Sequence, residues 1–115
     1  MSIEPQLVTV LSGIVSGGAF PDIAPAGTAL PYCTYQQVSG TPVNYLGAES
    51  SDKKSSRIQV NVWSATRAQA MTLIRQIEDA IVKAPLFGMV EGGAIATYDD
   101  VTKTRGAMQD FSFWA

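Results

Sequence analysis

The chain has 115 residues, 46% of them hydrophobic and 16% charged, which is enough for one domain with a two-layer core and too little for two. Its formal net charge of −2 argues against sequence-independent nucleic-acid binding, which depends on basic patches. No apolar run approaches the roughly 18 residues that cross a bilayer, and the N-terminus lacks the basic and apolar regions of a signal peptide. We expect residues 1–115 to form a single domain. The lone Cys33 cannot form an internal disulfide, so we expect synthesis in a reducing cytosol.

Residues 4–15 predict the first helix, because apolar side chains recur there at helical spacing. These side chains are Ile3, Leu7, Val10, Leu11 and Ile14. Pro5 suits a first helical turn, and Gly17 with Gly18 suits the end of a helix. Residues 19–31 contain three prolines and no period, so we expect a loop.

Residues 32–39 predict the first strand, since they are rich in strand-forming residues and lie between a proline and a glycine. Cys33, Tyr35 and Gln37 point to one side of this strand, and their neighbours point to the other. Alternation alone does not decide which side is buried. Residues 40–56 are polar and are expected to form a long loop, of a length that is uncommon in small domains.

Residues 57–82 predict a strand that leads directly into an amphipathic helix. Ile58, Val60 and Val62 alternate with polar residues, which is the period of a half-buried strand. The period then becomes helical, with the apolar residues Ala70, Ile74, Ile77 and Ile81. Ser64 and Thr66 lie at the change of period, where a hydroxyl can accept from the first N–H groups of a helix.

The rest of the chain predicts two more strands. Residues 89–98 form the third strand, weakened by Gly92 and Gly93, and residues 108–114 form the last. The polar segment between them reads as a connection. The predicted order is therefore α-β-β-α-β-β, and the predicted class is α+β: a mainly antiparallel sheet of about four strands with two helices packed on one face.

The sequence carries no sign of catalysis. It has no histidine, so the commonest general base and metal ligand are absent. Cys33 lies in a predicted strand and is better explained as a structural residue than as a nucleophile. Asp99 and Asp100 are better explained by turn chemistry than by cation binding. We therefore expect no catalytic, cofactor-binding or metal-binding residues.

Two features leave alternatives open. Lys53, Lys54 and Arg57 form a basic cluster, which is either a solvated loop or a contact with an acidic partner. Trp63 and Trp114 fall opposite the main apolar side of their strands, so each is either core at a sheet edge or an anchor in a subunit interface.

Three segments carry a resemblance to a known family. They are LPYCTYQQVSG at Leu30–Gly40, RIQVNVWS at Arg57–Ser64 followed at once by a helix, and the closing DFSFWA with Phe111 and Phe113. In these positions the chain resembles the tail-completion family of small phage and prophage proteins, a siphophage group that carries a domain of unknown function and is similar to tail terminators. The short C-terminus departs from that pattern and leaves little room for a tail arm.

The resemblance implies a structural role in virion assembly, without catalysis. Such proteins look like ring-forming subunits, commonly hexamers, that cap the tail tube and contribute to joining the head. The implied partners are other copies of the chain, the tail tube protein and the connector or neck proteins, with no specific nucleic acid and no membrane. The implied location is the head-proximal end of the tail, after synthesis in the bacterial cytoplasm.

The expected contacts lie on two regions. The sheet face without helices would present residues such as Tyr35, Gln59, Asn61 and Trp63, and the segment 40–56 with its flank would present Tyr45, Leu46, Lys53, Lys54 and Arg57. An alternative function is a non-viral structural or binding module of a phage-derived injection or secretion apparatus. A small-molecule enzyme is a distant third.

Overall fold

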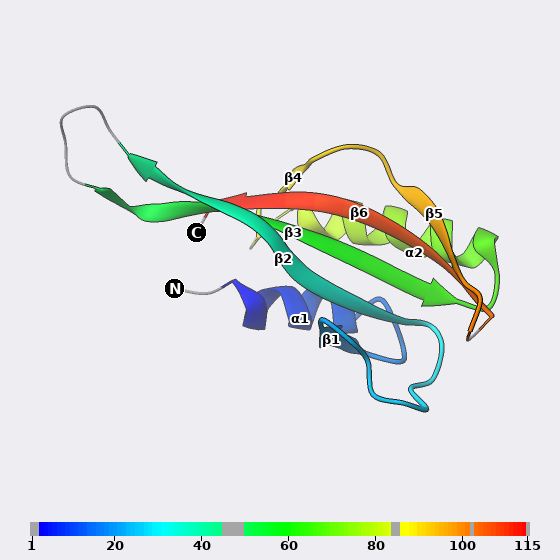
Figure 1. Cartoon of the computed structure of the whole chain (residues 1–115). Helices are drawn as coiled ribbons and strands as arrows, with labels where there is room; N and C mark the ends of the chain where they lie inside the picture. Colours follow the sequence, from blue (N-terminus) through cyan, green and yellow to red (C-terminus); the bar gives the residue numbers. More distant parts are fainter. Residues whose placement is uncertain (1–2, 45–49, 84–85, 102, 115) are drawn as a thin grey trace.

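The computed structural model describes residues 3–44, 50–83, 86–101 and 103–114, and within these ranges it leaves the side chains of residues 39–44, 50–55 and 114 undescribed. The helices are α1 (Glu4–Ser12) and α2 (Arg67–Ile81). The strands are β1 (Ala19–Pro21), β2 (Tyr32–Asn44), β3 (Ser50–Ser64), β4 (Met89–Val90), β5 (Ile95–Asp99) and β6 (Thr104–Trp114). Figure 1 shows the long strands β2, β3 and β6 side by side as one twisted sheet.

The strands form one mixed sheet in the order β1-β2-β3-β6-β4, and β5 also pairs with β6. The short β1 runs parallel to β2, whereas the other pairs are antiparallel. The predicted α+β class with a mainly antiparallel sheet is confirmed. The predicted number of about four strands is too low, because the described residues form six.

Both helices pack on the same face of the sheet, as predicted. The central strand β3 turns Ile58, Val60 and Val62 toward them, and all three are almost fully buried. Leu7 and Leu11 of α1 join the same cluster of buried residues. The helix α2 contributes Ala70, Leu73, Ile74, Ile77 and Ile81. These residues recur every three or four positions, so they form one stripe along α2 that lies on the sheet.

The turn between β3 and α2 follows the predicted chemistry. The hydroxyl of Thr66 accepts a hydrogen bond from the backbone N–H of Gln69 at 3.2 Å, which caps the helix. Ser64 is buried, and its hydroxyl donates to the carbonyl oxygen of Thr66 at 2.6 Å. The first helix ends at Ser12, three residues earlier than the predicted end, at a position followed by Gly13. Val15 nevertheless remains buried in the core.

The predicted loop 40–56 is wrong for most of its length. β2 continues to Asn44 and β3 begins at Ser50, so residues 40–44 and 50–56 belong to an antiparallel hairpin. Figure 1 shows this hairpin running past the helix-covered part of the sheet. A ribbon with no covered face needs no alternating apolar residues, and its polar composition therefore resembles that of a loop.

Two other segments differ from prediction. The expected strand 89–98 is split into β4 and β5, with Gly92 and Gly93 between them, because glycine weakens a strand interior. The expected loop 19–31 begins with β1, which pairs with residues 33–35 of β2. A three-residue parallel strand has no period that a sequence pattern can reveal.

Gly88 offers a test of how tightly this core is packed. A Cβ atom there would lie 2.6 Å from Ile81 Cγ2 and 2.7 Å from Phe113 Cε1, which is closer than packed atoms allow. We expect Gly88→Ala to lower the free energy of unfolding by about 1–3 kcal/mol through overpacking. The matched control is Gly93→Ala, where no heavy atom lies within 4 Å of the added carbon. Equal urea midpoints for the two variants would contradict this packing.

Candidate interaction surface

The sheet face that points away from the helices forms a continuous surface, which we call the open face. Cross-strand pairing places its residues in rows: Tyr32 beside Trp63, Thr34 beside Asn61, and Gln59 beside Asp110. No helix covers these residues in the part of the chain that the structure describes. Because side chains alternate along each strand, successive residues of the open face are separated in sequence by one residue that faces the core.

A chain of polar contacts runs along the open face. Arg57 Nε donates to Asp110 Oδ2 at 3.0 Å, and Gln59 Nε2 donates to Asp110 Oδ1 at 3.3 Å. Asn61 Nδ2 then donates to Gln59 Oε1 at 3.4 Å. The Arg57 side chain is 43% exposed, so this ion pair contributes little to folding stability. The contacts hold the side chains in fixed positions, and a face that is already ordered loses less entropy when it binds.

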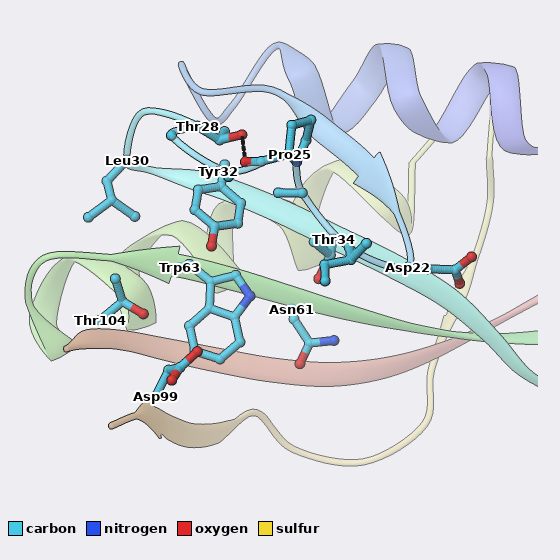
Figure 2. Close-up of a pocket in the computed structure, with 14 residues that line it drawn as sticks. Asp22, Pro25, Thr28, Leu30, Tyr32, Thr34, Asn61, Trp63, Asp99 and Thr104 are labelled. Carbon is cyan, nitrogen blue, oxygen red and sulfur yellow. Dashed lines mark hydrogen bonds between the residues drawn. The ribbon is translucent and has the colours of Figure 1, made fainter. Parts of the chain in front are cut away.

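A groove of about 690 Å³ lies at one end of the open face, under the loop that connects β1 to β2. Figure 2 shows the Tyr32 ring and the Trp63 indole in this groove, with the Asp99 carboxylate near the indole. Burial, and to a smaller degree the negative charge of Asp99, raises the pKa of Tyr32. The ionisable side chains that line the groove are Tyr32 and two carboxylates, Asp22 and Asp99. The groove therefore suits a neutral or cationic side chain of a partner rather than an anion.

Trp63 can lie in this position because the residue opposite it on β6 is Gly106, which has no side chain. A Cβ atom at Gly106 would lie 2.8 Å from Trp63 Cε3 and 2.8 Å from the carbonyl oxygen of Val62. The indole thus lies against bare backbone. Glycine is required at this point by close approach rather than by an unusual backbone angle, because a larger residue would lift the indole from the sheet.

The remaining candidates for chemistry have structural roles. Cys33 is fully buried on the core side of β2, and burial raises its pKa to about 12, so the thiol is not a nucleophile at neutral pH. Asp99 Oδ1 accepts from the backbone N–H of Val101 at 2.9 Å, which is turn chemistry, as expected. Within the described ranges, no three acidic, cysteine or histidine side chains gather as metal ligands would. No helix in those ranges is both long and apolar enough to span a membrane.

The structure brings together four of the nine expected contact residues. Arg57, Gln59, Asn61 and Trp63 lie on the open face, three of them in the polar chain. Tyr45 and Leu46 lie outside the described residues, and Lys53 and Lys54 are placed by their backbone only, in the hairpin part of β3.

The expectation that Tyr35 lies on the open face is wrong. Tyr35 is only 5% exposed and faces the helices, because its partner across the strands is the core residue Val60. Asp110 and the groove under residues 22–30 were not identified from the sequence as parts of the contact surface. Alternation with Phe111 and Phe113 could have placed Asp110 on the open face, but its pairing with Arg57 depends on the register between two strands far apart in sequence.

The sequence matches the family model described as "Tail completion protein gp17" over residues 6–115. A chain in the solved structure of the virion of a native gene transfer agent (GTA) particle has a similar fold, with a TM-score of 0.65 and 19% sequence identity. The alignment covers 96% of this chain and 89% of that chain, and at this identity the likeness concerns the fold alone. No curated protein matches the chain in sequence.

The contact between Trp63 and Gly106 predicts a change in fluorescence. We expect Gly106→Ala to displace the indole toward solvent, shift tryptophan emission to longer wavelength, and lower the free energy of unfolding by about 1–3 kcal/mol. Both proteins are compared in a Trp114→Phe background, so that only Trp63 reports. Gly93→Ala in that background is the control. Unchanged emission and unchanged quenching by acrylamide in Gly106→Ala would contradict the close approach.

Proposed function

Because the chain belongs to the tail completion protein family and is therefore a structural protein of the phage tail, present in the virion, we propose that it caps the tail tube as one subunit of a ring. The ring is hexameric in this proposal and contributes to joining the tail to the head. Its partners are neighbouring copies, the tail tube protein and the connector or neck proteins. The family match over residues 6–115 is the observation that carries the proposal.

The shape of the subunit supports a role in assembly. Two helices cover one face of the sheet, and the open face carries an ordered polar chain beside the half-buried Trp63. Aromatic and arginine side chains are the residues that most often anchor protein interfaces. The open face therefore has the composition of a surface that is buried in the assembled particle. Contacts between unlike patches of identical subunits are head-to-tail, and such contacts close into a ring when the rotation permits.

The hairpin of β2 and β3 is the second proposed contact region. A two-stranded ribbon without a covered face is only marginally stable in water, so a partner surface would stabilise it. Lys53 and Lys54 lie in this hairpin, and the connection 45–49 contains Tyr45 and Leu46. We propose that the hairpin carries these residues to the tail tube or to the connector, where the two lysines meet acidic groups.

The ring can be measured directly. We expect the purified protein to form a closed particle with a central hole, seen by light scattering over a concentration range and by negative-stain imaging. If the isolated protein is monomeric, we expect rings on the ends of purified tail tubes, because the tube then serves as template. A monomer that also fails to bind tubes would contradict the proposal.

The basic pair provides a test in assembling particles. We expect the double variant Lys53→Glu/Lys54→Glu to fold normally and to lower head-to-tail joining, because reversed charges repel an acidic partner. The measurement is the fraction of tails joined to heads in complementation, with melting temperature as the folding check. The matched control is Arg75→Glu/Lys83→Glu, which changes the net charge equally at exposed residues in and just after α2. Normal particle completion by the first variant would contradict a role for the two lysines.

A further inference from the structure

The sheet has two open edges on opposite sides. On one side β2 pairs with β1 only at residues 33–35, and from Gln36 to Asn44 its outer edge has no partner strand among the described residues. We call this stretch the β2 edge. On the other side β4 and β5 each pair only with β6, and we call residues 86–101 the β5 edge. The unpaired N–H and C=O groups of an edge strand are able to pair with a strand from another chain.

Exposed apolar side chains gather along these two edges. Among residues whose side chains are described, ten large hydrophobic residues are exposed, and six of them belong to the β5 edge. These six are Phe87, Met89, Val90, Ile95, Tyr98 and Val101. Ile23, Leu30 and Val38 lie on the side of β1 and β2, and only Val82 lies elsewhere, just after α2. A monomeric protein rarely leaves such a concentration of apolar surface in water.

We propose that the β5 edge of one subunit docks on the β2 edge of the next, so that the sheet continues from subunit to subunit around the ring. This inference rests on the proposed ring and names the two surfaces that close it. The occupant of each edge is a second copy of this chain. Both edges have unpaired backbone groups and exposed apolar side chains, so docking one on the other would pair the backbone groups and cover the side chains.

The symmetry of the contact follows from the position of the edges. A two-fold dimer through one edge would leave the other edge, with its apolar residues, exposed. Head-to-tail contact uses both edges in every subunit and leaves none open once the ring is closed. This geometry is also compatible with an open face that remains available to the tail tube or the connector, because the edges and the face are different surfaces.

The distribution of charge on the two edges favours contact between unlike edges over contact between two β5 edges. The β5 edge carries three carboxylates, Glu91, Asp99 and Asp100, and residues 86–101 contain no basic side chain. The β2 edge, residues 36–44, has no charged side chain. It can therefore accept the β5 edge without charge repulsion, whereas the carboxylates would disfavour pairing of two β5 edges with each other, although Asp100 is paired with Lys103.

The test uses one blocked edge at a time in the full-length protein. Ile95→Lys introduces a charge on the β5 edge, and Val38→Lys introduces one on the β2 edge. The control is Val82→Lys, at an apolar residue that is 41% exposed and belongs to neither edge strand. We expect each edge variant to stay folded by circular dichroism and thermal melting and to lose ring formation. An equimolar mixture of the two should form a dimer and nothing larger, because only one intact pair of edges remains.

If wild-type rings form only on tail tubes, single-cysteine variants give the same readout there. Val38→Cys and Ile95→Cys are treated with a short bifunctional maleimide, and buried Cys33 does not compete because burial raises its pKa to about 12. We expect cross-linked dimers from a mixture, a ladder from the double-cysteine variant, and no cross-link from either single variant alone.

Three outcomes would overturn the inference and leave the proposed function intact. They are wild-type-like rings from either lysine variant, a mixture that stays monomeric while the wild type forms rings, and dimers of a single-cysteine variant alone. A wild-type protein that forms no ring, in solution or on tubes, would overturn the proposed function together with this inference. Loss of rings in Val82→Lys as well would show that added charge, rather than a blocked edge, is responsible, and would also count against the inference.

Discussion

Pairing of β3 on both sides is the constraint on which the rest of the structure depends. Residues 55–64 of β3 pair with β6, and nearly all of the same stretch pairs with β2. Once Ile58, Val60 and Val62 face the helices, the register decides the orientation of every neighbour. Tyr35 and Phe111 must then face the core, and Asp110 must face the other way. A shift of one residue in either ladder would turn a whole strand around, so the core and the open face are specified together.

The same pairing explains why the open face of the subunit is ordered. Trp63 packs against Gly106, which is directly opposite it on β6, and Arg57 reaches diagonally across the same two strands to Asp110, which is opposite Gln59. What these contacts provide is a surface with fixed side chains. Fixed side chains are of use to a structural protein of the phage tail, which must present the same surface to its neighbours in every particle.

The two ends of the sheet differ in how their strands are stabilised. Over the helices, β2, β3 and β6 are held by a covered apolar face as well as by backbone hydrogen bonds. In the hairpin the ladder continues from Gly40 opposite Ser56 to Asn44 opposite Ser50, and no helix lies beneath it in Figure 1. The hairpin is therefore held chiefly by the backbone ladder and by its continuity with the sheet. An element of this kind is suited to reach a partner, because a partner surface can supply the missing cover.

The sequence by itself determined the local elements with strong periods. The alternation of β3, the apolar stripe of α2, the Thr66 cap and the outward position of Gln59, Asn61 and Trp63 all follow from patterns a few residues long. Only the tertiary structure decided the buried side of β2, the extension of residues 40–44 and 50–56 into a hairpin, the division of residues 89–98 into two edge strands, and the pairing of Arg57 with Asp110. These features depend on which strands lie next to one another and in which register. That information comes from contacts between residues far apart in the chain, and no local period contains it.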